Sequence, residues 1–256
     1  MEIYVSHFVV FILIFLRTTS LIVTAPIFGN QAVPVQFKAA LGLFLSLVLL
    51  PLQLSSAPVV DTKLLGLAVL AVQEVIVGAM IGFATGLVFE GIRFAGDIIG
   101  FGMGFTLAET FDPETNASTA VVGEMMYTLV AMYFILLNGH HFILESLQLS
   151  YASVPFGHLS LSIAVPVDLV KMTGAVFVVA MKFAAPVMVA VFLADVTLAI
   201  LTRITPQMNI FGVAFALKIG VGLIVLISSL PVMIVVFKKL LGVFENDVLQ
   251  LVKVLS

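Results

Sequence analysis

The sequence contains no cysteine, and only 10% of its 256 residues are charged. The absence of cysteine excludes disulfide bonds, thiolate zinc sites and a cysteine nucleophile. The formal net charge is −3 and the four histidines are scattered, so the chain has no basic patch that could neutralise a run of phosphates. We therefore expect no nucleic-acid partner.

Catalytic and nucleotide-binding motifs are also missing. The P-loop pattern G-x-x-x-x-G-K-[ST], the serine-hydrolase pattern G-x-S-x-G and the zincin pattern H-E-x-x-H do not occur. His141 and Glu145 would share a helical face, but no second ligand cluster lies near them in the sequence. Asp195 has no second mid-span aspartate with which it could form a proteolytic pair. We expect no catalytic residues, no metal site and no cofactor.

Apolar side chains, in contrast, are present in excess. The chain is 62% hydrophobic and its mean hydropathy is +1.26. Soluble domains contain roughly 45–50% apolar and about 25% charged residues. This composition predicts an integral membrane polypeptide. The first 23 residues lack a basic n-region and an A-x-A-like cleavage site, so we expect a retained first helix rather than a removed signal peptide.

Hydropathy predicts about six apolar spans within one all-α domain that covers residues 1–256. They are Ile3–Thr24, Phe37–Leu54, Leu64–Phe89, Ala120–Leu137, Leu169–Ala194 and Ile210–Phe237. The third would reach about 39 Å, whereas a bilayer core is about 30 Å thick. Tilt would absorb this excess, and so would long bent helical hairpins packed against other subunits. An amphipathic helix is predicted after the last span, with one apolar face formed by Leu240, Leu241, Phe244, Val248 and Leu251.

Three of the longest apolar stretches carry an ion near the midpoint: Glu74, Lys182 and Lys218. A charge at the centre of a membrane span costs about 2.5–3.5 kcal/mol on insertion scales. Such ions mark either a proton or ion path, or ion pairs that anchor subunits. No repeated acidic relay accompanies them, which favours pairing. Either lysine could then pair with Glu74, Asp195 or a carboxylate of a partner.

Glycine is concentrated between residues 78 and 104. Gly78, Gly82 and Gly86 follow one another at four-residue spacing, which places three hydrogens on one helical stripe and allows another helix to approach closely. Glycine then recurs too often for a comfortable helix interior. These later positions are Gly91, Gly96, Gly100, Gly102 and Gly104.

Bulky apolar residues follow among small ones, at Met103, Phe105, Leu107 and Phe111, before the turn signal Asp112-Pro113. A flexible backbone that carries bulky apolar side chains suits a movable plug, since a hydrophobic constriction closes a pore by dewetting it. The alternative is a tight connection between helices, with these side chains packed in a core. The pattern alone favours the second interpretation.

Three motifs resemble those of a known family. The stretch 195–218, DVTLAILTRITPQMNIFGVAFALK, is similar to the C-terminal signature of the FliR family of flagellar type III export proteins. Its core is Arg203-x-x-Pro206-Gln207-Met208-Asn209-x-Phe211, followed by Lys218. The other two motifs are Arg17 with Ala25-Pro26-x-Phe28-Gly29 and Val33-Pro34, and Gly100-x-Gly102-x-Gly104-Phe105 with Asp112-Pro113. Together they span nearly the whole chain, and the family's injectisome relatives share much of the pattern.

The resemblance implies a non-enzymatic subunit of the flagellar export gate. Its implied partners are the P- and Q-type subunits FliP and FliQ, the components FlhB and FlhA, membrane lipid, and the unfolded flagellar proteins that cross the gate. The implied location is the bacterial inner membrane at the flagellar basal body, with much of the helical body above the bilayer plane. The equivalent injectisome subunit and a stand-alone small-solute or ion transporter remain alternatives.

The resemblance also bears on individual residues. It implies that a loop of this subunit plugs the closed channel, which makes residues Met103–Asn116 the plug candidate. The candidates for assembly contacts or buried ions are Arg17, Glu74, Lys182, Asp195, Arg203 and Lys218.

Overall fold

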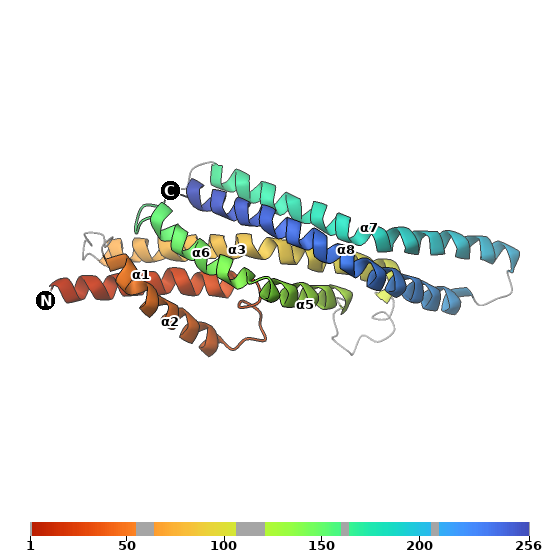
Figure 1. The fold of residues 1–256 in the computed structure, drawn as a ribbon, viewed down its shortest axis with the longest axis horizontal. Coiled ribbons are helices and arrows are strands. Elements are labelled where there is room, and N and C mark those ends of the chain that lie inside the picture. Colours follow the sequence, from red (N-terminus) through yellow and green to blue (C-terminus); the bar gives the residue numbers. More distant parts are fainter. Residues whose placement is uncertain (1, 55–63, 106–120, 160–163, 206–209, 256) are drawn as a thin grey trace. The chain divides into compact units, whose positions relative to one another are not determined.

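The chain is built from helices (Figure 1), and the computed structural model describes residues 2–54, 64–105, 121–159, 164–205 and 210–255. The helices are α1 (Glu2–Thr24), α2 (Val35–Gln53), α3 (Leu64–Met103), α5 (Val121–Leu136), α6 (Gly139–Ser153), α7 (Ala164–Ile204) and α8 (Ile210–Val254). No strand occurs within these ranges. The all-α prediction is therefore confirmed.

Three of the helices are much longer than the spans predicted for them. α3, α7 and α8 contain 40, 41 and 45 residues, so each is about 60 Å long or more, twice the thickness of a bilayer core. Five of the described helices are long and apolar enough to cross a membrane, and a sixth span results if the bent pair α5 and α6 is counted as one. The predicted number of about six spans is confirmed.

The glycine-rich part of α3 corrects one expectation. The helix continues through Gly91, Gly96 and Gly102 and ends at Met103, whereas the predicted span ended at Phe89 and the later glycines were expected to disfavour a helix interior. Gly104 follows with φ of 90°, a left-handed conformation that glycine adopts at little cost and that commonly ends a helix. Close packing offsets the intrinsic penalty of these glycines, because a Cβ would lie 2.6 Å from the Gly123 Cα at Gly96, 2.7 Å from the Met188 sulfur at Gly102 and 3.3 Å from the Val176 carbonyl oxygen at Gly91.

Helix α6 lies outside the six predicted spans, and the sequence indicated only a helical face shared by His141 and Glu145 in this region. Asn138 breaks the helix with a left-handed φ of 59°, and α6 then runs from Gly139 to Ser153. Its buried face combines apolar and hydroxyl side chains: Ile143, Ser146, Leu147, Ser150 and Tyr151. The serines reduce the hydropathy of this segment, which explains why it was not recognised.

The described chain separates into two compact units. Unit 1 contains residues Met1–Leu87, Phe134–Thr173 and Gly242–Ser256, and unit 2 contains Val88–Tyr133 and Gly174–Leu241. Neither unit is one continuous stretch of chain, because α3, α5, α7 and α8 contribute residues to both. The assignment of a single domain stays a prediction.

In unit 1, α1 runs beside the first part of α3 (Figure 1) and presents a nearly fully buried apolar stripe. Its core includes Val10, Leu13, Ile14, Leu21, Val77, Ile81, Leu147, Val248 and Leu251. Of the apolar face predicted beyond Phe237, four residues are buried and one is half-buried: Leu241, Phe244, Val248 and Leu251 are buried, and Leu240 is intermediate. That segment is the continuous end of α8 rather than a separate helix.

Helix α2, also in unit 1, buries its polar face and exposes its apolar one. Its buried residues are Lys38, Gly42 and Ser46. Lys38 donates to the carbonyl of Gly29 over 2.8 Å, and Gly42 packs against Thr19 of α1. The apolar side chains Phe37, Leu43, Phe44, Leu47, Val48 and Leu52 are all exposed. This inverted distribution is typical of a helix whose outer face lies in lipid or against another protein.

In unit 2, an aromatic cluster joins α3, α5 and α8. The ring centroid of Phe89 lies 6.0 Å from that of Tyr127 and 6.2 Å from that of Phe237, and Tyr133 meets Phe237 at 6.0 Å. Such tilted and edge-to-face pairs stabilise a core beyond simple burial of area. The remaining core of this unit includes Ile92, Ile99, Met103, Val122, Met126, Val179, Phe183, Val187, Val191 and Leu226.

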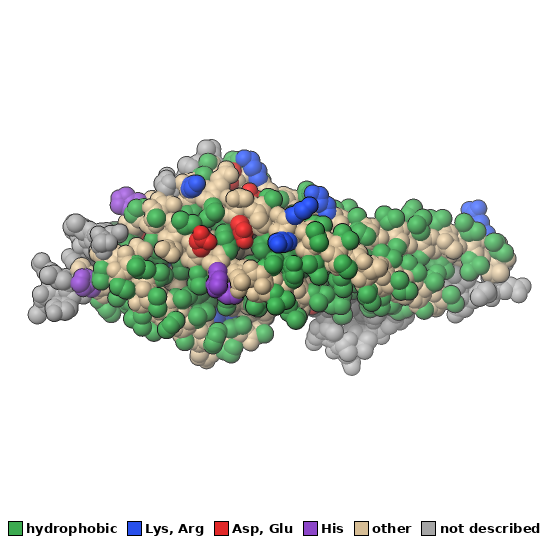
Figure 2. Space-filling model, viewed as in Figure 1, with side chains coloured by type: hydrophobic (Ala, Val, Ile, Leu, Met, Phe, Trp, Pro, Cys, Tyr) green, Lys and Arg blue, Asp and Glu red, His purple; other side chains and the backbone are tan. Residues whose placement is uncertain are grey.

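Hydrophobic side chains also dominate the surface. Figure 2 shows them over much of the visible face, with few charged groups between them. In unit 2, Phe177, Met181, Phe192, Ile224 and Ile227 are each between 58% and 69% exposed. A surface of this kind is not compatible with water and requires lipid or partner proteins around it.

Candidate functional site

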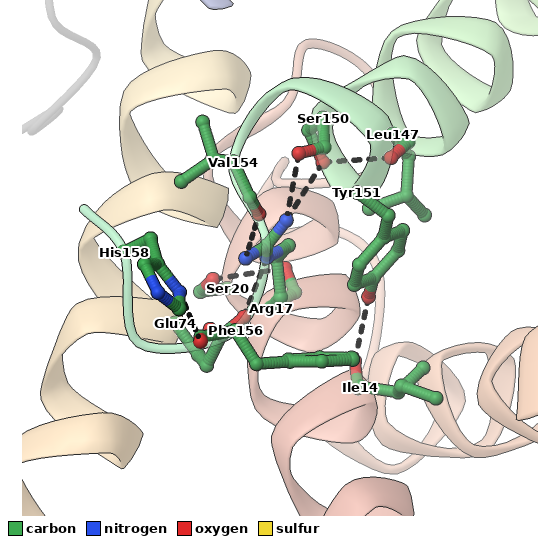
Figure 3. Close-up of polar contacts among 10 residues, drawn as sticks. All are labelled: Ile14, Arg17, Ser20, Glu74, Leu147, Ser150, Tyr151, Val154, Phe156 and His158. Atoms are coloured by element: carbon green, nitrogen blue, oxygen red, sulfur yellow. Dashed lines mark hydrogen bonds and ion pairs between the residues drawn. The ribbon is translucent and has the colours of Figure 1, made fainter. Parts of the chain in front are cut away.

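Arg17, on α1, is the most deeply buried ion of the described chain. Its side chain is 0% exposed, and its Nε donates to Oε2 of Glu74 on α3 over 2.5 Å (Figure 3). Glu74 is itself 1% exposed. A buried ion pair is tolerated only where further hydrogen bonds satisfy the remaining donors, so the rest of the guanidinium matters.

The other two nitrogens of Arg17 cap the C-terminal end of α6. Nη1 donates to the carbonyl of Ser150 over 3.1 Å and to its hydroxyl over 3.3 Å, and Nη2 donates to the carbonyl of Val154 over 3.0 Å. The last carbonyls of a helix lack partners within the helix and carry partial negative charge. The planar guanidinium supplies both the donors and the opposite charge.

Aromatic rings complete the surroundings of the guanidinium. Its carbon lies 4.4 Å from the ring centroid of Tyr151 and 5.7 Å from that of Phe156, within cation–π range. The Tyr151 hydroxyl donates to the carbonyl of Ile14 over 3.4 Å, which ties the ring back to α1. We call this set of contacts the Arg17 node, composed of Arg17, Glu74, Ser150, Tyr151, Val154 and Phe156.

The Arg17 node corrects the predicted pairing of Glu74. The sequence suggested Lys182 or Lys218 as its partner, and the structure instead pairs it with Arg17, 57 residues earlier in the chain. Both ions of the node are enclosed by this chain alone. Their contacts hold α1, α3 and α6 together within unit 1.

The glycine stripe of α3 lies directly against α1 in the same unit. A Cβ at Gly78 would overlap the carbonyl of Arg17, and one at Gly82 would come within 2.7 Å of the carbonyl of Leu21. At Gly86 the nearest atom is the Thr24 carbonyl at 3.8 Å, an ordinary contact distance. The two closest approaches thus lie beside the Arg17 node, where the helix backbones must come near one another for the ion pair to form.

In unit 2 the structure pairs Lys218 of α8 with Asp195 of α7, with 2.6 Å between Nζ and Oδ1. The lysine side chain is 25% exposed and that of the aspartate 46%. Pairing of these two residues was one of the combinations expected from the sequence. Their partial exposure leaves both groups accessible to a further partner.

The remaining two ion candidates have no such contacts within the described residues. Lys182 is exposed in the middle of α7, and Arg203 is exposed in the last turn of the same helix. Arg203 is favourably placed there, because a cation near a helix C-terminus opposes the partial negative charge of the terminal carbonyls. The six ion candidates therefore form two pairs and two single cations, not one cluster.

The plug candidates are only partly described. Met103, at the end of α3, is fully buried, and an added Cβ at Gly222 of α8 would lie 3.0 Å from its sulfur. Phe105 is half-buried. Leu107 and Phe111 lie outside the described residues. Met103 is thus a core residue of unit 2, and the plug assignment of the segment that follows it stays a prediction.

One close contact in unit 2 was not anticipated. Gly96 of α3 and Gly123 of α5 meet so closely that a Cβ at Gly96 would lie 2.6 Å from the Gly123 Cα. Arg93 and Glu124 form an ion pair beside this contact. The sequence marked Gly96 only as one of several glycines that are too frequent for a comfortable helix interior. The charges at 93 and 124 gave no sign of their pairing, because it depends on how the two helices cross.

Known proteins match this chain over most of its length. Residues 8–243 match the family described as bacterial export proteins, family 1. The flagellar biosynthetic protein FliR of Bacillus subtilis (strain 168) is 30% identical over 244 residues, which cover 92% of this chain and 91% of that protein. The FliR protein of Escherichia coli (strain K12) is 30% identical over 217 residues, 84% of this chain and 82% of that one. That of Aquifex aeolicus (strain VF5) is 27% identical, with 91% and 92% covered.

Proposed function

Because this chain belongs to family 1 of the bacterial export proteins, and within it to the FliR family of the flagellar export apparatus, we propose that it is a structural and gating subunit of the flagellar protein export channel. In this role it passes unfolded flagellar proteins across the inner membrane together with the P- and Q-type subunits FliP and FliQ. The FlhB and FlhA components and the membrane lipid are its further partners. It acts without catalysing a reaction of its own.

One observation carries the proposal: the family match runs from residue 8 to residue 243 and so includes nearly all of the described helices. The relatives are flagellar proteins by name, which favours the flagellar system over the injectisome. The length and the apolar outer surface of the helices support a role in an assembly. Helices of about 60 Å exceed the thickness of a bilayer core, so the apolar surface beyond the bilayer needs other proteins around it. Much of the helical body then lies above the bilayer plane at the basal body.

The segment 103–116 supplies the gate in this proposal. Its first residue, Met103, is anchored in the core of unit 2, and Gly104 ends α3 with a left-handed φ of 90°. The bulky side chains at Phe105, Leu107 and Phe111 close the channel by excluding water from it. The rigid end of α3 and the glycine after it support this role, since a plug needs a fixed base and a bend.

Purification from membranes tests the proposal. The full chain, tagged and expressed with the other export genes, should copurify with FliP and FliQ in a complex of defined mass. A deletion of its gene should abolish swarming, and the plasmid-borne chain should restore it. If the chain instead forms a discrete monomer that catalyses solute flux in liposomes, it is a transporter and the proposal fails. Its chromosomal neighbours, flagellar or virulence genes, decide between flagellum and injectisome.

A further inference from the structure

Lys182 is the one mid-span ion of the three whose charge the described chain does not compensate. Glu74 pairs with Arg17 and Lys218 pairs with Asp195, whereas Lys182 is exposed and forms no ion pair within the described residues. It lies near the middle of α7, which runs from Ala164 to Ile204. An ammonium group is therefore left on the outer face of a long apolar helix.

The surface around Lys182 is apolar over several turns. Val178, Val189 and Leu193 lie four residues before it and seven and eleven after it, so they share its helical face, and they are 53%, 59% and 59% exposed. No charged residue occurs at 172–181 or at 183–194. Lys182 is thus a single cation within an exposed apolar strip.

The position of α7 along the membrane normal cannot accommodate both the charge of Lys182 and the apolar residues on either side of it. If Lys182 lies within the hydrocarbon, its charge faces lipid, which is unfavourable. If α7 is displaced along its axis until Lys182 reaches the membrane surface, one of the apolar strips 172–181 and 183–194 lies outside the hydrocarbon instead. Lipid alone satisfies only one of the two requirements, whereas an apolar protein surface with one acceptor satisfies both.

Pro186 adds a second polar group at the same turn. α7 continues as a helix through Pro186, and the residue four positions earlier is Lys182. Because proline has no N–H, residue 186 cannot donate the regular i+4 helical hydrogen bond to the backbone carbonyl of Lys182. Both residues are exposed. The turn therefore combines a charged donor with a backbone carbonyl that lacks its regular i+4 donor, in an otherwise apolar strip.

We infer that this face of α7 is the docking site of an apolar helix from another export-gate subunit, and that this helix carries a carboxylate which accepts a hydrogen bond from Nζ of Lys182. The inference rests on the proposed function, since only the assembled gate provides such a helix. Charge complementarity selects the partner, because a carboxylate is the side chain that neutralises an ammonium in a medium of low dielectric.

Site-specific photo-crosslinking identifies what lies on the strip. A photoreactive phenylalanine at Val178 or at Val189, in the assembled complex in native membranes, should attach to another gate subunit next to a carboxylate within an apolar segment. Attachment to phospholipid alone, or to a second copy of this chain, would overturn the inference.

Substitutions at Lys182 then measure the contribution of the charge. Lys182→Glu should lower the amount of the crosslinked subunit that copurifies with the tagged chain by about tenfold or more, because it places two carboxylates together. Lys182→Arg should retain the subunit, since the charge is kept. The matched control is Lys171→Glu on the same helix, where the lysine is 72% exposed and lies beside Asp168, and it should change little.

A reciprocal exchange guards against misfolding of the variant. Changing the partner's carboxylate to lysine should restore the complex in the Lys182→Glu background. If the unaltered chain captures no export subunit, the proposed function fails. If it captures its partners and Lys182→Glu does so equally well, the proposed function stands and the docking inference is wrong.

Discussion

Arg17 donates its Nε–H to Oε2 of Glu74 over 2.5 Å, and neither side chain is more than 1% exposed. The same guanidinium donates to the carbonyls of Ser150 and Val154 at the end of α6. One side chain of α1 thus joins α3 and α6. Its loss removes the counter-ion of the buried Glu74 carboxylate and the side-chain donor to the Val154 carbonyl, and an uncompensated buried charge is strongly destabilising.

Arg17→Met should lower the free energy of unfolding by about 3–5 kcal/mol, because it leaves the charge of Glu74 uncompensated in the interior. Arg17→Lys should recover only part of this, since an ammonium group cannot reproduce the planar fork that reaches both α3 and α6. Unfolding of the purified protein in detergent, followed by circular dichroism, measures the effect. Arg203→Met, at an exposed arginine, is the control. Equal losses from both substitutions would contradict a special role for the Arg17 node.

Removal of both ions should be less harmful than removal of one. The double variant Arg17→Met with Glu74→Leu leaves no unpaired charge, so it should be more stable than Arg17→Met alone. The same unfolding assay, run as a double-mutant cycle, gives the coupling energy of the pair. A double variant whose loss equals the sum of the two single losses would show that the residues do not interact energetically.

The glycine stripe permits a matched comparison between two alanine substitutions on one helix. Gly82→Ala should destabilise the protein by about 1–3 kcal/mol, because the new methyl group would meet the carbonyl of Leu21 and force α1 away. Gly86→Ala should be neutral or stabilising, since its nearest neighbour is 3.8 Å away and alanine favours helix. Thermal unfolding of the two variants distinguishes them. If Gly82→Ala proves the milder change, α1 does not lie as close to α3 as described.

The Lys218–Asp195 pair should tolerate an exchange of its two charges better than the reversal of one charge alone. Lys218→Glu places a second carboxylate beside that of Asp195. The amount of assembled export complex and the extent of swarming should therefore fall. Adding Asp195→Lys should restore most of both, because the pair is re-formed with opposite polarity. Stability of the isolated chain should change little, since both groups are partly exposed. Failure of the exchange to restore function would show that one of these residues has a different partner in the assembly.

Two classes of effect are expected along the plug candidate. Phe105→Gly combined with Leu107→Gly and Phe111→Gly should let ions leak through the assembled gate, since the hydrophobic constriction is lost. Met103→Gly should instead reduce stability by about 2–5 kcal/mol, because this side chain fills the core beside Gly222. Membrane conductance in cells and unfolding of the purified chain separate the two outcomes. Unchanged conductance in the triple variant would remove the plug assignment.

The helical architecture was predictable because long apolar runs and breakers are local signals. The ends of the long helices were not. Hydropathy marks apolar residues, whereas a helix ends where its hydrogen bonding ends, so α7 continues past Asp195 to Ile204. α3 likewise runs through its glycines, since packing against a neighbouring helix compensated for their weak propensity.

The sequence identified the candidate ions one by one, but it did not predict which of them would pair in the core. Arg17 and Glu74 each stand out in an apolar stretch, yet nothing in the chain between them indicates that they meet. Their contact depends on the approach of α1 to α3. The stripe at Gly78 and Gly82 predicts that some helix approaches closely, but it does not say which one. The capping of α6 could not be foreseen, because α6 itself was not recognised as a helix.

The Arg17 contacts also impose an order on biosynthesis. Arg17 leaves the ribosome 57 residues ahead of Glu74, and 133 and 137 residues ahead of Ser150 and Val154, whose carbonyls it caps at the end of α6. A nascent chain that has inserted α1 and α2 therefore holds an uncompensated cation, and water or the insertion machinery must solvate it until α3 arrives. Since the node closes only after α6 is made, the first helix of this protein becomes fully stable late in translation.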